Sequence, residues 1–160
     1  NNQTVQNLKQ ESEKRDIDSN RIIFARGLPI EQHLSRYTLA DLFLDTFPYG
    51  AHTTCGDALW SGLPVLTLKG NTFASRVSSS LLRAINLDEL ITNSVDEYKS
   101  LAINLAKNPQ KLNAIKKRLK IDKDKSALFD NKNYTKDLET AYKIIYKRNN
   151  EFKPVDDIII

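Results

Sequence analysis

The spacing of hydrophobic positions changes several times along the chain, and each change predicts a structural element. Residues 1–20 are polar, and Val5 and Leu8, three positions apart, predict a weak amphipathic helix that ends near Arg15. Apolar, β-branched or aromatic runs predict three short buried strands, and helical spacing predicts helices between and after them. The strands are expected at 21–24, 41–45 and 63–68, and the helices at 31–39, 52–60 and about 73–85. This alternation is typical of a parallel sheet covered by helices.

From residue 95 onward the apolar residues recur only with helical spacing. Pro109 falls where the first residue of a helix would lie, and three apolar stripes at 98–105, 112–119 and 134–146 predict further helices. We therefore expect a helix or linker belonging to an upstream lobe at 1–20, an α/β core at 21–94, C-terminal helices at 95–150 and a tail at 151–160.

Composition and charge narrow the class of protein. The chain is 40% apolar and 28% charged, which fits a globular protein with a core. Its net charge is +4, but eight Lys and Arg residues lie between Lys107 and Lys125, where a solvated helix face is favoured over a site for an anionic partner. We therefore expect no nucleic-acid partner. The sequence contains no Met and begins with Asn1, so we expect it to be a piece of a larger protein.

Other features bear on metals, membranes and compartment. A single Cys excludes an internal disulfide and favours a reducing, cytoplasmic compartment, and with only two His in separate segments no metal site is expected. No apolar run approaches the roughly 18 residues that a membrane span needs. We read Cys55 as a small packing residue, since no base lies beside it in the sequence.

The segment from Asp45 to Trp60 is the strongest candidate for a binding site. It joins the carboxyl end of a predicted strand to the start of a predicted helix, and ligands of open α/β sheets bind at that edge. The first N–H groups of a helix have no internal partners and attract anions. Thr53 and Thr54 add hydroxyl donors and His52 adds a ring N–H, so a diphosphate would meet several donors.

A simpler interpretation of the same residues is a capping box. In it Thr54 caps the helix and Asp57 reaches back to a backbone N–H. Gly56 argues for the ligand, because a glycine in the first turn costs a helix about 1 kcal/mol and allows close approach to the backbone. On spacing alone the two interpretations are about level.

Three further side chains have both a functional and a structural interpretation. His33, on the helix after Pro29, is either a surface residue or a ring that stacks on a base, with Arg36 one turn further on the same face. Arg76 lies near the start of a helix that Asn71 or Thr72 can cap, where a bound anion would offset the unfavourable interaction of a cation with the helix dipole. We treat Arg76 as a possible anion-binding residue.

Several joined motifs strongly resemble the O-GlcNAc transferase family, whose members are protein glycosyltransferases with tetratricopeptide repeats and include the SPINDLY-type O-fucosyltransferases. The similarity runs from about Arg21 to Arg148. It rests on Arg21-Ile22-Ile23-Phe24, Leu39-Ala40-Asp41, Leu44-Asp45-Thr46-Phe47-Pro48-Tyr49, His52-Thr53-Thr54, Asp57-Ala58-Leu59-Trp60-Ser61-Gly62-Leu63-Pro64-Val65-Leu66-Thr67 and Phe73-Ala74-Ser75-Arg76-Val77. The resemblance implies an α/β, Rossmann-like C-terminal lobe of a two-lobed GT-B glycosyltransferase, the lobe that holds most of the nucleotide-sugar donor.

The resemblance also implies a role for each matching residue. The Leu28 backbone would meet the uracil edge, His33 would pack on the base and Arg36 would support that pocket. The triplet His52, Thr53 and Thr54 would hold the diphosphate, and Asp57 would bind the ribose hydroxyls. Two positions depart from the family pattern: Ile30 stands where O-GlcNAc transferases carry a Lys, and Gly50 where bacterial relatives usually carry Asn.

The resemblance implies a metal-independent, inverting transfer of GlcNAc from UDP-GlcNAc to Ser or Thr of an acceptor protein. The N-terminal lobe, the repeats, the phosphate-binding Lys and the catalytic base would precede residue 1, so the chain alone would be inactive. Two alternatives stay open. One is another donor, such as GDP-fucose or UDP-glucose, and the other is a non-catalytic nucleotide-binding or interaction module.

Overall fold

The computed structural model describes all residues from 1 to 160, in two compact units of residues 1–33 and 34–160. The boundary falls inside the short helix α2 (Ile30–Arg36). The boundaries expected at 20/21, 94/95 and 150/151 stay a prediction.

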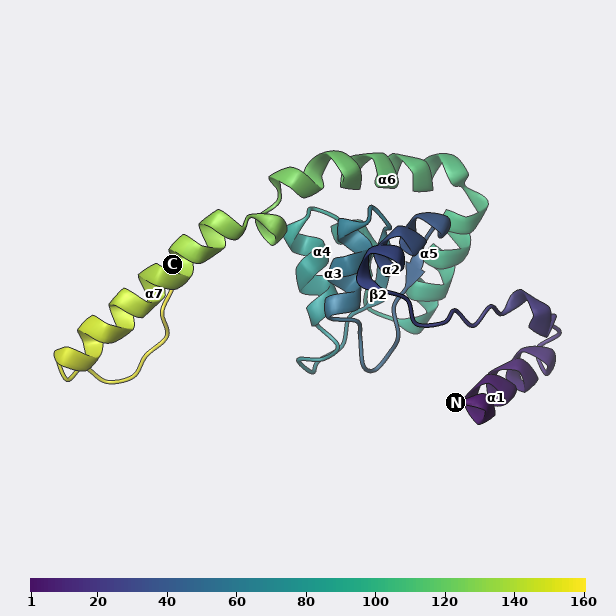
Figure 1. The fold of residues 1–160 in the computed structure, drawn as a ribbon, viewed down its shortest axis with the longest axis horizontal. Coiled ribbons are helices and arrows are strands. Elements are labelled where there is room, and N and C mark those ends of the chain that lie inside the picture. The colour runs from purple at the N-terminus through teal and green to yellow at the C-terminus, as the bar shows by residue number, and fades with distance from the viewer. The chain divides into compact units, whose positions relative to one another are not determined.

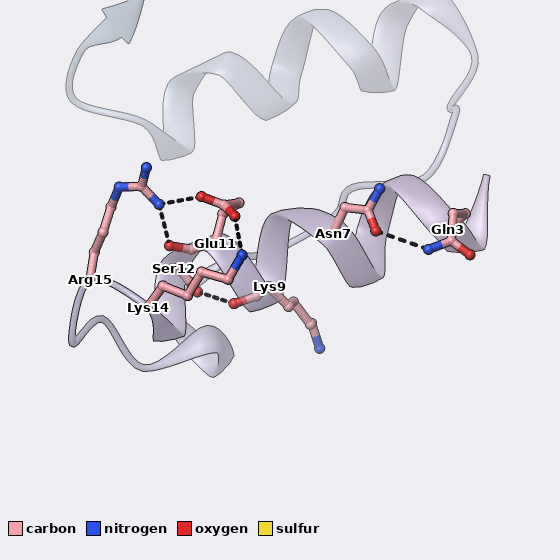
Figure 2. Close-up of polar contacts among 7 residues, drawn as sticks. All are labelled: Gln3, Asn7, Lys9, Glu11, Ser12, Lys14 and Arg15. Carbon is pink, nitrogen blue, oxygen red and sulfur yellow. Dashed lines mark hydrogen bonds and ion pairs between the residues drawn. The ribbon is translucent and has the colours of Figure 1, made fainter.

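The N-terminal unit begins with α1 (Asn2–Glu13), which confirms the first predicted helix. Asn1 caps α1 by accepting a hydrogen bond from the Thr4 N–H. Figure 2 shows Glu11 between Lys14 and Arg15, and these two cations lower the pKa of Glu11 to about 2. The 3₁₀ turn η1 (Ser19–Arg21) follows.

The strand predicted at 21–24 is wrong. The stretch from 22 to 29 is irregular, and the Ile23 side chain is 87% exposed. An apolar, β-branched run becomes a strand only where another strand accepts its backbone hydrogen bonds, and no strand in this chain pairs with it.

The larger unit is built on a parallel sheet, as expected. Its strands are β1 (Phe43–Leu44), β2 (Val65–Leu68) and β3 (Ile91–Thr92), in the order β1-β2-β3. The strands predicted at 41–45 and 63–68 are confirmed with shorter bounds, whereas β3 was not predicted. All four residues of β2 are buried, as in a central parallel strand with both faces covered.

The helices between strands cover this sheet. α3 (Thr53–Trp60) and α4 (Val77–Ala84) contact each other and β2, whereas α5 (Val95–Lys107) packs on β2 and β3. Figure 1 shows α5 on the other side of β2 from α3 and α4. α4 begins later than predicted, because a Thr72–Ser75 hydrogen-bonded turn precedes it. The core is apolar and includes Cys55, Ala58, Leu59, Leu63, Val65, Leu82, Ile85, Leu87, Leu90, Leu105, Ile115 and Leu119.

The remaining elements are helical, as predicted. They are η2 (Tyr37–Leu39), η3 (Asp88–Leu90), α6 (Pro109–Asp122), η4 (Lys123–Lys125), η5 (Ala127–Phe129) and α7 (Asn131–Asn150). Pro109 is the first residue of α6, as its position in the sequence predicted. No helix of the structure is long and apolar enough to cross a membrane.

Candidate functional site

The loop between β1 and α3 is held by one buried carboxylate. Asp45 is 5% exposed, and its Oδ1 accepts hydrogen bonds from the N–H groups of Thr46 and Ala51 at 2.8 and 2.7 Å. Its Oδ2 accepts a hydrogen bond of 2.8 Å from the Thr67 hydroxyl of β2. The carboxylate therefore fixes both ends of the loop to the central strand.

Other bonds tie this loop to its surroundings. The Tyr98 hydroxyl of α5 donates to the Asp45 carbonyl at 2.9 Å, and the Ser78 hydroxyl of α4 donates to the Ala51 carbonyl at 2.7 Å. Burial and the nearby Asp45 charge raise the pKa of Tyr98 to about 12, so this hydroxyl stays protonated and keeps donating at neutral pH. The loop is thus attached to helices on both sides of the sheet.

Gly50 occupies a position where a side chain would not fit without a shift. Its N–H donates to the Ala74 carbonyl, and a Cβ built there would lie 3.1 Å from Asp45 Oδ2 and 3.2 Å from that carbonyl oxygen. The close packing of loop, carboxylate and the 72–76 turn accounts for glycine at this position.

His52 lies at the end of the loop, where α3 begins. Its ring stacks on Tyr49 with centroids 5.2 Å apart, and meets the edge of Phe73 at 5.8 Å. Its Nε2 lies 3.3 Å from the Ala74 carbonyl oxygen, which only accepts, so Nε2 carries the proton in this contact. The ring is therefore oriented by three neighbours, and Nδ1 is the nitrogen left for a ligand.

The first turn of α3 leaves backbone donors unused. His52 is the N-cap residue, and its carbonyl accepts the N–H groups of Cys55 and Gly56, whereas those of Thr53 and Thr54 donate to no protein atom. The side chains of Thr53 and Thr54 are exposed. Two N–H groups and two hydroxyls therefore converge at the positive end of a helix dipole, which suits an anion.

The capping box considered as the alternative for Thr54 and Asp57 does not form. The N-cap residue is His52, two residues before Thr54, so Thr54 lies inside the first turn, and no side chain caps α3. The structural alternative to a ligand at these residues is therefore absent.

Two hollows open on either side of this helix start. One, of about 550 Å³, is lined by the loop and includes Asp45, Thr46 and Tyr49. The other, of about 510 Å³, lies over α3 and is lined by residues that include Gly56, Asp57, Trp60 and Phe129. His52 and Thr53 line both hollows, so a ligand bound at the helix start has space on each side.

Gly56 faces open space in the hollow over α3. A Cβ at Gly56 would meet no atom within 4 Å, so glycine is not required there by protein packing. Its absent side chain leaves the backbone of the first turn open to a ligand, as the sequence suggested.

Asp57 and Arg36 lie in one electrostatic neighbourhood. Burial and then the negative charge of Asp57 raise the pKa of Tyr37, while the positive charge of neighbouring Arg36 lowers it. Arg36 is the last residue of α2. The structure therefore brings four of the expected residues together at the start of α3, namely His52, Thr53, Thr54 and Asp57, whereas Arg36 and Asp57 share Tyr37 as a neighbour.

The other expected residues belong to different parts of the fold. Leu28, in the irregular stretch, and half-buried His33, in α2, belong to the N-terminal unit. Arg76 is the N-cap residue of α4 and lines a separate pocket. Cys55 is fully buried, and burial raises the pKa of its thiol to about 12, which confirms a packing role.

Sequence reasoning missed the residues that hold the site in place. Asp45, Tyr49 and Phe73 lie within the family motifs but had no role assigned to them, and their role appears only in contacts with β2 and His52. The available signal for Asp45 was a carboxylate directly after a predicted strand and before a loop with Pro48 and Gly50. The structure contains no group of three or more His, Cys, Asp or Glu side chains arranged to hold a metal ion.

Comparison with known proteins identifies the family. The model of glycosyl transferase family 41 matches residues 2–138. The UDP-N-acetylglucosamine–peptide N-acetylglucosaminyltransferase of Caenorhabditis elegans is 35% identical over 145 residues, which are 91% of this chain and 13% of that protein. The probable enzyme of the same name from Arabidopsis thaliana, SEC, is 39% identical over 127 residues, 79% of this chain and 13% of its own length.

A solved structure supports the same assignment. A mutant O-GlcNAc transferase of Thermobaculum terrenum superposes with a TM-score of 0.83 at 33% identity, over 89% of this chain and 28% of that one. The α/β fold is therefore that of the C-terminal lobe of a GT-B glycosyltransferase, and the chain spans about an eighth of the length of the curated relatives. The chain belongs to glycosyl transferase family 41.

Proposed function

We propose that this chain is the donor-binding part of a protein O-GlcNAc transferase, which transfers GlcNAc from UDP-GlcNAc to Ser or Thr hydroxyls of acceptor proteins. The observation that carries the proposal is the start of α3, where the N–H groups of Thr53 and Thr54 are unused beside an oriented His52 ring. Family membership and relatives named as N-acetylglucosaminyltransferases support the donor and the reaction.

In this proposal each residue meets one part of the donor. The diphosphate lies against the Thr53 and Thr54 N–H groups and hydroxyls. His52 binds it as the imidazolium, in which Nε2 donates to the Ala74 carbonyl and Nδ1 donates to a phosphate oxygen. The ribose lies near Asp57 and the open backbone of Gly56. Arg36, Leu28 and His33 serve the uracil. Fixed donors aimed at the diphosphate stabilise the charge that grows on the leaving group during transfer. The acceptor-side groups belong to the rest of the protein. The compartment in this proposal is the cytoplasm, where a lone free cysteine such as Cys55 is usual.

Nucleotide binding to the full-length protein tests the proposal. Calorimetry with UDP, UDP-GlcNAc, UDP-glucose and GDP-fucose should show the tightest binding for the UDP and UDP-GlcNAc pair, and mass spectrometry of co-expressed proteins should find HexNAc on Ser or Thr. Tighter binding of GDP-fucose would mean that GDP-fucose is the donor, bound at the same proposed site. Nucleotide binding without any protein modification would favour the non-catalytic module.

A substitution at His52 tests whether this residue binds the donor or only packs within the fold. His52→Ala should reduce kcat/KM for transfer about ten- to a thousandfold, the cost of losing one donor that stabilises transition-state charge. It also removes ring contacts with Tyr49 and Phe73 and the hydrogen bond from Nε2 to the Ala74 carbonyl, so the free energy of unfolding should fall by about 1–2 kcal/mol while the protein stays folded. Exposed Tyr146→Ala is the aromatic control and should change neither quantity. Wild-type transfer by the His52 variant would contradict the proposed site.

A further inference from the structure

A second pocket with positive charge lies on α4 and the turn that precedes it. It has a volume of about 580 Å³ and is lined by Lys69, Phe73, Arg76 and Arg83, together with Ser79 and Ser80. No Asp or Glu lines this pocket. The charged side chains of this pocket are therefore all positive, whereas the hollow over α3 includes the carboxylate of Asp57.

The positive charges of this basic pocket are little compensated within the chain. The side chains of Lys69 and Arg76 take part in no ion pair or hydrogen bond, although Lys69 is half-buried. Arg83 lies 3.6 Å from Asp88, but both side chains are more than half exposed, so solvent weakens that pair. Low-dielectric walls lined by charge of one sign concentrate the field on an incoming anion.

Arg76 also lies where a cation does not stabilise the fold. It is the N-cap residue of α4 and makes no capping hydrogen bond there. The positive end of a helix dipole disfavours a nearby cation by some tenths of a kcal/mol. Folding therefore does not explain this arginine, whereas a bound carboxylate would interact with both the guanidinium and the helix start.

The basic pocket adjoins the proposed donor site. Val77 and Leu81 line both this pocket and the hollow over α3. Phe73, a wall of the basic pocket, meets the His52 ring edge at 5.8 Å, and Ala74 next to it accepts hydrogen bonds from the loop. A ligand that passes over His52 therefore reaches the basic pocket without crossing another element.

In the proposed function, an acceptor polypeptide has to come close to the donor site. For transfer, its hydroxyl must approach the donor sugar to about 3–3.5 Å. An extended chain advances about 3.3–3.6 Å per residue, so side chains two to four residues from the hydroxyl lie roughly 7–14 Å away. We propose that the pocket of Lys69, Arg76 and Arg83 binds an acidic side chain of the acceptor polypeptide, two to four residues from the modified Ser or Thr. This inference rests on the proposed function.

Peptide binding to the full-length protein tests this proposal. Two fluorescein-labelled decapeptides with one central Ser differ only in carrying Glu or Gln at the positions two to four residues from it. Fluorescence anisotropy, in the presence of UDP, should show about three- to tenfold tighter binding of the Glu peptide, and the preference should shrink as salt rises. The combined variant Lys69→Gln and Arg76→Gln should bind both peptides equally. Its melting temperature should not fall, because it removes a cation from a helix start.

A matched variant controls for net charge. Lys117→Gln with Lys120→Gln removes the same charge from the exposed face of α6 and should keep the preference for the Glu peptide. Equal binding of the two peptides by the wild-type protein, or an unchanged preference in the Lys69 and Arg76 variant, would overturn the inference. A loss of UDP affinity in that variant, with peptide preference retained, would assign the pocket to the donor instead. Failure of the wild-type protein to bind UDP would contradict the proposed function, whichever peptide it prefers.

Discussion

The Asp45 carboxylate closes the loop between β1 and α3 with hydrogen bonds that no strand ladder supplies. It accepts two loop N–H groups and one hydroxyl from β2, all at 2.7–2.8 Å. A buried acceptor with this many donors is costly to change, because each donor left without a partner loses its hydration and gains nothing in return. The position of His52, which follows Ala51 directly, therefore depends on Asp45.

Asp45→Asn should impair both the stability of the protein and its binding of the donor. The amide offers one oxygen where the carboxylate offers two, and its NH₂ group faces a donor, so the free energy of unfolding should fall by about 1–3 kcal/mol. Because the loop carries His52, donor KM should also rise. Thermal unfolding and transfer kinetics of the full-length protein measure the two effects.

Asp41→Asn is the matched control for this substitution. Asp41 lies just before β1 with an 84% exposed side chain, paired with Lys116 at 2.7 Å. An exposed pair of this kind contributes about 0–1 kcal/mol, so the control should change stability little and donor KM not at all. Equal effects of the two substitutions would mean that the Asp45 bonds do not position the loop.

At the residue scale, local chemistry was predictable and remote contacts were not. His52, Thr53 and Thr54 could be placed at a helix start because the strand, loop and helix signals are adjacent in sequence. Asp45 contacts Thr67, 22 residues away, and Tyr98 contacts Asp45 from 53 residues away. No spacing rule connects positions so far apart, because the sheet brings them together.

At the element scale, the same four-residue spacing forms a capping box in one helix and not in another. Ser94 accepts a hydrogen bond from the Glu97 N–H at 3.1 Å, and Glu97 accepts one from the Asn93 N–H, so this pair caps α5. Thr54 and Asp57 have the same spacing but lie inside α3. Spacing alone does not decide where a helix begins. The loop held by Asp45 leads into α3 two residues before the position that a Thr54 cap would require.

This difference predicts opposite results for two alanine substitutions. Ser94→Ala removes a cap and should cost about 1 kcal/mol of stability, with donor binding unchanged. Thr54→Ala removes no cap, and alanine favours helix, so stability should stay within about 0.5 kcal/mol while donor affinity falls. Chemical denaturation and UDP calorimetry give the two quantities. A clear loss of stability in Thr54→Ala would restore the capping interpretation.

The strands show the same limit of prediction. The strand expected at 21–24 has no partner in the chain, and the two-residue strand β3 is too short to give a periodic signal. Both errors concern pairing, which depends on other parts of the chain. The long helices α5, α6 and α7 were predictable because their apolar stripes repeat over several turns.

At the scale of the whole molecule, the proposed function gives this chain the donor side of a transfer reaction. It spans 13% of the length of the Caenorhabditis elegans relative, and its described site offers groups for a donor diphosphate and ribose. A transferase also has to orient an acceptor hydroxyl within about 3–3.5 Å of the sugar. The resemblance to O-GlcNAc transferases assigns that task, and the catalytic base, to the part of such proteins that precedes this region.

We therefore expect transfer to require more than these 160 residues. The purified chain, incubated with UDP-GlcNAc and a Ser/Thr peptide pool, should give no HexNAc-modified peptide by mass spectrometry, whereas the full-length protein should. Circular dichroism of the purified chain should show its helices. The lack of transfer then reflects missing catalytic groups and not an unfolded sample. Full-length His52→Ala is the negative control, since it keeps the acceptor side and weakens only the donor site. If the purified chain transfers GlcNAc, and its His52→Ala variant does not, then this lobe carries its own catalytic base. That base would be sought among the residues around His52 and Asp57.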